Sequence, residues 1–398
     1  MRFNAETRSN RGGSLVFSPR VLCVLCVSAL SSLLPGGLYG QQLTCRNGRC
    51  ERVINGSVPA AARLRIRAHG PVTLQGGTVP NLTYTVKITA TARTDAEARR
   101  IVLMSAVRVE SGGPWTVLNT PGGPVETTVS VKASRLTAVN VTTSDGAVQV
   151  TGIEGQVDVD TGAGEIMVDR VRGDCNLTTG GGHIRCGQVG GALKCSTGAG
   201  KVSVDSVRGE AVLATQGGDI YAREAGGVVR AETGGGGVHI GTAGGPVTAI
   251  SGGGEIIVEK SGGIVTLRNM AGPVNVGTAA GVRCDSASGG IRLANISGPI
   301  RVATSMGSIN ATLYGSNVAD SYLATGNGDI TVLIPSNLGV TIQADNTMAD
   351  TLRRIISDFS AVQPRRQGTH VVAAGTVNGG GPVLQLAATG GTIFIKKQ

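Results

Sequence analysis

The amino-acid sequence predicts an all-β protein: a parallel β-solenoid of about ten 18-residue, two-strand coils, with irregular β caps and one short N-terminal helix. Three observations predict this fold. Glycine makes up 63 of 398 residues, without the every-third-residue spacing of collagen. Hydrophobic residues make up 40%, too many for a disordered chain, and abundant glycine disfavours helices. Finally, a motif of constant length repeats through the middle of the chain.

Residues 1–40 are typical of a signal peptide. The fourteen-residue apolar run Val21–Leu34 would form a helix of about 21 Å, which is short of the ~30 Å hydrocarbon core of a membrane. A basic region precedes it, with four arginines: Arg2, Arg8, Arg11 and Arg20. We expect this segment to be a cleaved secretory signal, so that the mature chain is exported to the periplasm, the cell surface or the extracellular medium. No later run is long and apolar enough to predict a transmembrane span.

The net charge is +10, and about +7 remains once the charge of the first forty residues is removed. Nucleic-acid binding requires clustered Lys and Arg with interleaved aromatic residues. Only small basic clusters occur here, such as Arg365 and Arg366, and they contain no aromatic residue. The composition therefore predicts no nucleic-acid partner.

Residues 41–136 are expected to form an N-terminal β-rich cap. They contain irregular strand patterns, such as RLRIRAH and YTVKITATA, and one helix candidate, DAEARRIVLMSA. Thr94 or Asp95 is the expected N-cap of that helix, whose first turn is acidic. A solenoid needs such caps because each end coil has a neighbour on only one side.

Residues 137–316 carry the repeat. From Gln156 to Gly281 the chain divides without insertion into seven consecutive 18-residue blocks, the first being QVDVDTGAGEIMVDRVRG. Block positions 2 and 4 are apolar or small, and positions 11 and 13 repeat this pattern. The alternation predicts two short strands per block, each with one buried face. Equivalent strands would then stack as parallel neighbours about 4.8 Å apart.

Glycine recurs at the middle and at the end of each block. We expect it there because turns between short strands need positive φ and close backbone approach, both of which a Cβ opposes. The predicted structural turn glycines are Gly164, Gly173, Gly182, Gly191, Gly200, Gly209, Gly218 and Gly227.

A column of hydroxyl side chains occupies block position 6: Thr161, Thr179, Thr197, Thr215 and Thr233. One interpretation is a ladder that matches ice or another lattice, which requires a flat face with two regular Thr columns. The neighbouring outward positions vary instead. The favoured interpretation is therefore structural, with each hydroxyl bonded to the backbone of a turn.

Six cysteines follow the signal segment. Cys45 and Cys50 flank an Asn-Gly pair that favours a tight turn, so they are candidates for a small disulfide loop in an oxidising compartment. Four others occupy inward positions as core residues, and their pairing is left open: Cys175, Cys186, Cys195 and Cys284. A bridge from Cys175 to Cys186 is disfavoured because facing sheets lie nearly 10 Å apart. A zinc site that includes His183 is disfavoured because this histidine points outward.

No residue is predicted to be catalytic, to bind a cofactor or to ligate a metal. A polysaccharide-active β-helix enzyme, one alternative, needs paired carboxylates about 5–10 Å apart. Asp158 and Asp160 share one outward face, but Asp219 and Glu255 are isolated. A calcium-stiffened β-roll, the other alternative, needs a repeated Asp, whereas the residue after the mid-block glycine varies from coil to coil.

Residues 317–398 are expected to continue the β structure and to cap its other end. The run ATGNGDITVLIPSNLGVTIQAD, followed by RIISDF and GTVNGGGPVLQLAATGGTIFIKK, resembles the bacterial "putative adhesin" family of β-strand-repeat proteins, a domain of unknown function. The resemblance spans residues 141–398 and includes the glycine-rich coils. It implies an exported, envelope-associated, non-enzymatic β-solenoid, and it carries over no ligand residues.

The expected function is accordingly that of an exported, non-catalytic protein, adhesin-like or an envelope scaffold and binding protein. Its expected partner is an envelope protein, a polysaccharide or a surface. No cofactor is expected, and neither is a transmembrane span after removal of the signal.

Overall fold

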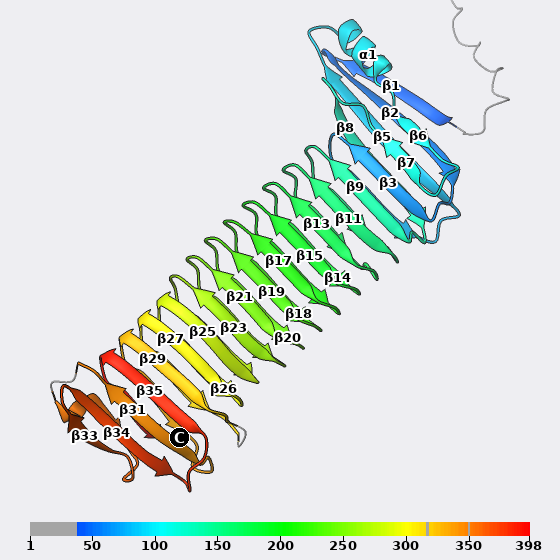
Figure 1. Cartoon of the computed structure of the whole chain (residues 1–398). Helices are drawn as coiled ribbons and strands as arrows, with labels where there is room; N and C mark the ends of the chain where they lie inside the picture. Colours follow the sequence, from blue (N-terminus) through cyan, green and yellow to red (C-terminus); the bar gives the residue numbers. More distant parts are fainter. Residues whose placement is uncertain (1–37, 316–317, 349–350) are drawn as a thin grey trace, which may run out of the picture. The chain divides into compact units, whose positions relative to one another are not determined.

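The computed structural model of the chain describes residues 38–315, 318–348 and 351–398 (Figure 1). These residues belong to one compact unit, Gly37–Gln398. The expected signal peptide, residues 1–40, lies outside the described residues except for its last three, which begin the first strand.

The middle of this unit is a parallel β-solenoid, as the repeat predicts. Each coil contributes one strand to each of two sheets, called sheet A and sheet B, and Figure 1 shows the strands stacked coil on coil. Equivalent residues of successive coils pair eighteen positions apart, as Val157 does with Cys175. Within the described residues, eleven coils follow one another from β9/β10 to β29/β30.

The solenoid strands of sheet B are β9 (Ala138–Thr143), β11 (Gln156–Thr161), β13 (Cys175–Thr179), β15 (Leu193–Thr197), β17 (Ala211–Thr215), β19 (Val229–Thr233), β21 (Val247–Ser251), β23 (Ile264–Asn269), β25 (Gly281–Ser288), β27 (Ile300–Met306) and β29 (Ser321–Asn327). Those of sheet A are β10 (Val148–Thr151), β12 (Ile166–Asp169), β14 (Ile184–Val189), β16 (Val202–Val207), β18 (Ile220–Ala225), β20 (Val238–Ala243), β22 (Ile256–Ser261), β24 (Val274–Ala279), β26 (Ile291–Ile296), β28 (Ile309–Leu313) and β30 (Ile330–Ile334).

Two coils depart from eighteen residues without breaking the stack. Val265 pairs with Val282, seventeen positions on, and Arg301 pairs with Tyr322, twenty-one positions on. Strand pairing continues past both changes, because the difference in length falls in the turns between strands.

The N-terminal end stacks its coils out of sequence order. In sheet B, β3 (Arg63–Ala68) lies between β9 and β7 (Thr116–Asn119). In sheet A, β4 (Val72–Gly77) lies between β10 and β8 (Glu126–Ser134). Antiparallel strands extend both sheets beyond this point: β5 (Asn81–Thr91), β2 (Arg49–Pro59) and β1 (Leu38–Arg46) in sheet A, and β6 (Arg108–Glu110) in sheet B.

The predicted helix is α1 (Asp95–Met104). Of the two expected N-caps, Thr94 takes the role, because its Oγ1 accepts a hydrogen bond of 3.2 Å from the backbone N–H of Glu97. Ala98 and Val102 are buried against Cys50 and Ala90, which lie on β2 and β5. The helix therefore covers the N-terminal end of sheet A.

The C-terminal end also departs from sequence order. In sheet B, β35 (Val383–Gly390) lies between β29 and β31 (Val340–Asn346), and β34 (His370–Val377) and β33 (Gln363–Gln367) follow as antiparallel strands. In sheet A, β36 (Ile393–Lys397) lies between β30 and β32 (Ile355–Ser357). A short 3-10 helix that the sequence did not predict, η1 (Leu352–Arg354), precedes β32.

One continuous core of small aliphatic side chains runs from Ile54 to Ile395. The predicted inward positions 2, 4, 11 and 13 are buried throughout the blocks, as at Val157, Val159 and Ile166. A third inward position of sheet A, block position 16, was not recognised from the sequence. It is buried in successive coils as Val171, Val189, Val207, Ala225, Ala243 and Ser261.

Candidate functional site

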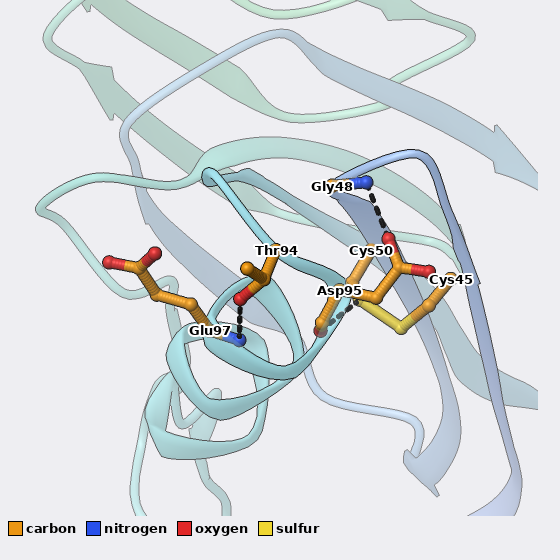
Figure 2. The surroundings of a disulfide bond; sticks show 6 residues. All are labelled: Cys45, Gly48, Cys50, Thr94, Asp95 and Glu97. Carbon is orange, nitrogen blue, oxygen red and sulfur yellow. Dashed lines mark hydrogen bonds between the residues drawn. A yellow bond between two sulfur atoms is a disulfide. The ribbon is translucent and has the colours of Figure 1, made fainter.

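Cys45 and Cys50 form a disulfide bond across the hairpin of β1 and β2 (Figure 2). Asn47 and Gly48 both have positive φ, which is the geometry of the tight turn that Asn-Gly favours. The N–H of Gly48 donates a hydrogen bond to the carboxylate of Asp95, the first residue of α1. The disulfide loop is thus attached directly to the beginning of the helix.

The turn glycines are placed by close approach and not by backbone conformation. A Cβ on Gly164, Gly182, Gly200 or Gly218 would collide with backbone of the preceding coil. None of the eight predicted turn glycines has a φ in the left-handed range, so the expectation of positive φ was wrong for them. The physical reason for glycine at these positions is that the turns stack directly on one another and leave no room for a side chain between coils.

The threonine column bonds the turns of adjacent coils to one another. Thr197 is buried, and its hydroxyl donates to the carbonyl oxygen of Gly182 at 2.8 Å and accepts from the N–H of Gly200 at 3.2 Å. The other four predicted threonines make the same two contacts: Thr161, Thr179, Thr215 and Thr233. Each hydroxyl therefore satisfies two backbone groups of turns that no strand ladder reaches.

A groove runs along the solenoid beside this column, and we call it the turn groove. It comprises two adjoining hollows of about 470 Å³ and 820 Å³, which share Glu232, Thr233 and Gly234. The groove crosses seven strands of sheet B, from Ser196 on β15 to Ser305 on β27, which is roughly 29 Å at the usual strand spacing. Its walls are the residues at block positions 5 and 7, and its floor is block position 6, occupied along the groove by Thr197, Thr215, Thr233, Ser251, Asn269, Ser286 and Thr304.

The turn groove has a mixed lining. Glu232, Arg268 and Asp285 supply charges of both signs, whereas Ile250 and the exposed Met270 supply apolar surface. Small residues alternate with these, including Ala214 and Ala303 near the two ends. The threonine column was predicted from the sequence, but the groove was not. The signal was present in position 7, where glycine recurs as Gly198, Gly234 and Gly252 and leaves those coils without a side chain at the groove.

The outward face of sheet A carries a second polar cluster. Tyr221 and His239 lie on adjacent strands with ring centroids 5.9 Å apart, and the ammonium of Lys201 lies 3.9 Å from the centre of the Tyr221 ring. His239 Nε2 lies 2.8 Å from a carboxylate oxygen of Glu259. These contacts join residues eighteen or twenty positions apart, so the cluster follows from the coil register.

Asp219 and Glu255, the two carboxylates that were expected to be isolated, each contact a neighbouring coil. Asp219 accepts a hydrogen bond of 2.8 Å from the N–H of Gly237, and Glu255 accepts one of 2.8 Å from Asn275 Nδ2.

The four remaining cysteines are buried free thiols. Cys186 on β14 of sheet A and Cys195 on β15 of sheet B face each other across the core with 3.8 Å between their sulfur atoms, a pair that was not singled out from the sequence. Burial raises the pKa of the Cys175 thiol, and it raises the pKa of Cys284 to about 12. Thiols held in this protonated form are poor nucleophiles, which agrees with a core role.

His183 points away from the cysteines. Its Nδ1 accepts a hydrogen bond of 2.9 Å from the N–H of Lys201 in the next coil. Over residues 38–315, 318–348 and 351–398, no three His, Cys, Asp or Glu side chains are grouped so that they could hold a metal ion. In the same residues, no helix has both the length and the apolar character needed to cross a membrane.

Comparisons with known proteins find likeness at the level of structure. The chain matches the crystal structure of a putative adhesin from Bacteroides fragilis at 12% identity and a TM-score of 0.27, covering 71% of this chain and 96% of the other. It also matches the crystal structure of a putative cell adhesion protein from Clostridium sporogenes at 10% identity and a TM-score of 0.19, covering 87% and 100%. No protein-family model and no curated protein matches the sequence. The assignment of a β-solenoid accordingly rests on the strand register described above.

Proposed function

We propose that this chain is an exported, non-catalytic binding protein of the bacterial cell envelope, of the adhesin-like or scaffold type. The observation that carries the proposal is the turn groove, which crosses seven coils without interruption. A groove of this length suits an extended partner, such as a polysaccharide chain, that lies across the strands and contacts several coils at once. A small-molecule site would instead be closed and compact.

Two features support export. The sequence begins with a basic region and a fourteen-residue apolar run, which is the pattern of a secretory signal. The disulfide between Cys45 and Cys50 suits an oxidising compartment. Periplasm, cell surface and medium all meet that condition.

The non-catalytic part of the proposal is supported by how outward carboxylates are used. Glu259 contacts His239, Asp205 lies 3.9 Å from Arg223, and Glu165 lies 3.2 Å from Arg185. Each of these carboxylates pairs with a basic side chain of a neighbouring coil. Glycoside chemistry instead requires two carboxylates that flank one bond.

Blocking the groove tests binding. The mature chain, residues 41–398, is incubated with isolated bacterial envelope fragments, and the bound fraction is measured after sedimentation. We expect Ala214→Trp and Ala303→Trp, which place a large ring at either end of the groove, to weaken binding at least fivefold. Val212→Trp is the matched control, because Val212 lies on the same strand as Ala214 but does not line the groove. Equal binding by all three variants contradicts the proposal.

Two further measurements test the proposed lack of catalysis and the proposed export. Release of reducing sugar ends from the envelope fragments would show an enzyme and contradict a non-catalytic role. Residues 1–40 fused to a phosphatase that is active only outside the cytoplasm should give activity that disappears when Val21–Leu34 is deleted. An inactive fusion would contradict export.

A further inference from the structure

Three arginines surround a hollow at the opposite turns of the coils from the turn groove. We call it the arginine hollow. Arg170, Arg172 and Arg208 line it together with Gln188, Ser206 and Gly190, and its volume is about 550 Å³. The lining contains no carboxylate. This site plays no part in the proposed binding along the turn groove.

The register explains how the hollow arises. Arg172, Gly190 and Arg208 occupy block position 17 in three successive coils, where the N–H of Gly190 donates to Val171 at 2.7 Å and that of Arg208 to Val189 at 3.0 Å. The two arginines are thus two coils apart, about 10 Å. Glycine must stand between them, because a Cβ on Gly190 would collide with the backbone of Arg172. The missing side chain leaves a depression with a guanidinium on either side.

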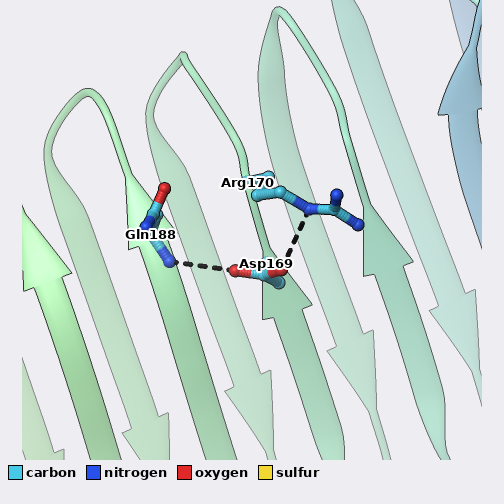
Figure 3. Close-up of polar contacts among 3 residues, drawn as sticks. All are labelled: Asp169, Arg170 and Gln188. Atoms are coloured by element: carbon cyan, nitrogen blue, oxygen red, sulfur yellow. Dashed lines mark hydrogen bonds and ion pairs between the residues drawn. The ribbon is translucent and has the colours of Figure 1, made fainter.

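Arg170 is held in an unusual conformation. Its φ is +53°, in the left-handed region, and the equivalent residue of the preceding coil is Gly152, with φ +72°. Arg170 Nε donates to Asp169 at 3.1 Å, and the same carboxylate accepts from the N–H of Gln188 at 3.2 Å (Figure 3). The bond to Asp169 holds the guanidinium at its Nε atom. Its two terminal nitrogens, Nη1 and Nη2, have no partner among the described residues. Strained non-glycine residues of this kind concentrate at binding sites.

The charge of the hollow is only partly neutralised. Arg172 lies 3.7 Å from Glu154, and both side chains are exposed, so this pair contributes little. Within the described part of the chain, the side chain of Arg208 makes no hydrogen bond or ion pair. Several guanidinium N–H groups are therefore available to an anion, and guanidinium binds a carboxylate through two parallel hydrogen bonds.

We propose that the arginine hollow binds a carboxylated sugar, that is, a uronate residue of an acidic polysaccharide. The arginines would hold the carboxylate, and the side chains of Gln188 and Ser206 would bond sugar hydroxyls. Val171 and Val189 form an apolar base suited to the C–H groups of a sugar ring. A bare phosphate or sulfate ion would leave most of a 550 Å³ hollow unfilled.

The test is a calorimetric titration of the mature chain with trigalacturonate. We expect Arg172→Gln and Arg208→Gln each to lower the affinity about tenfold, because each removes one charge-assisted contact. The matched control is Arg283→Gln, which removes the same charge from β25 outside the hollow. Arg170→Gly is the most informative variant. It relieves the strained backbone, so thermal stability is kept or raised while affinity falls.

Several outcomes would overturn the assignment. The first is that trigalacturonate does not bind at all. The second is that the Arg172 and Arg208 variants bind it as tightly as the Arg283 control does. The third is that the chain binds methyl-esterified trigalacturonate as tightly as it binds trigalacturonate itself. Displacement of the trisaccharide by equimolar inorganic phosphate would show a general anion site instead. Ala214→Trp should leave this titration unchanged, so failure at the arginine hollow and failure of the turn groove are read out separately.

Discussion

Gly200 and Gly217 lie in equivalent turns of successive coils, yet only Gly200 is in close contact with a neighbouring coil. A Cβ on Gly200 would collide with the backbone of Gly182, whereas a Cβ on Gly217 would have no atom within 4 Å. We expect Gly200→Ala to lower the free energy of unfolding by about 3 kcal/mol or more, because two coils must separate. Gly217→Ala should be neutral or slightly stabilising. Urea unfolding of the two variants measures the difference, and equal midpoints would contradict the close-approach explanation.

The threonine column leads to a second prediction at this scale. Thr197→Val keeps the shape of the side chain but leaves the carbonyl of Gly182 and the N–H of Gly200 without their hydroxyl partner. The cost should be about 1–3 kcal/mol. Hydrogen exchange at the Gly200 amide should therefore accelerate roughly tenfold or more. Thr197→Ser retains both hydrogen bonds and serves as the control; if it exchanges as fast as the Val variant, the hydroxyl is not the cause.

A third residue-level prediction concerns pH. Burial raises the pKa of Cys284 to about 12, from a usual value near 9.0. Between these values the folded chain keeps a proton that the unfolded chain loses, so stability falls as pH rises, by up to about 1.4 kcal/mol per pH unit. Below pH 9 this effect is absent. Cys284→Val should flatten the stability profile between pH 9 and 12, and an unchanged slope would contradict the assignment.

At the scale of elements, the strands differ in how replaceable they are. Each middle coil pairs with the coil before it and the coil after it, and every junction is alike. The last two strands are different. β35 separates β29 from β31 and β36 separates β30 from β32, so each completes its sheet between two strands that do not pair with each other.

This contrast gives a paired deletion experiment. Removing residues 211–246 excises two whole coils and joins Glu210 to Val247, which has the same block position as Ala211. We expect a folded protein that is shorter by about 10 Å in solution scattering. Removing residues 383–398 takes out fewer residues but should unfold the C-terminal end and promote aggregation through unpaired edges. The reverse outcome would contradict the strand order described here.

The unit as a whole shows which features a sequence can reveal. The constant period predicted the two ladders, four of the buried block positions and the turn-bonding hydroxyl column, because a fixed length of chain forces equivalent residues to stack. The ends were expected only as irregular caps. Strands such as β3 and β35 lie in the sheets beside strands that are distant in the sequence. A pairing of this kind does not depend on a repeat, so the sequence shows no periodic pattern that would predict it.

The binding surfaces were predictable only in part, for a related reason. Thr197 and Gly200 are visible as columns, because most coils repeat the same residue type at the same block position. The arginine hollow depends instead on differences between coils: Gly190 stands where its neighbours have arginine, and Arg170 adopts a conformation that Gly152 takes one coil earlier. Features of this kind are recognised only when the coils are aligned and compared in three dimensions.

The late position of β35 and β36 in the chain has a consequence for biosynthesis. A polypeptide is made from its N-terminus, so these strands are made after all the coils of the solenoid, and one edge of β29 and of β30 stays unpaired until then. A product that ends prematurely keeps those edges open and remains accessible to proteases. The fold is therefore completed only after both of these strands have been made.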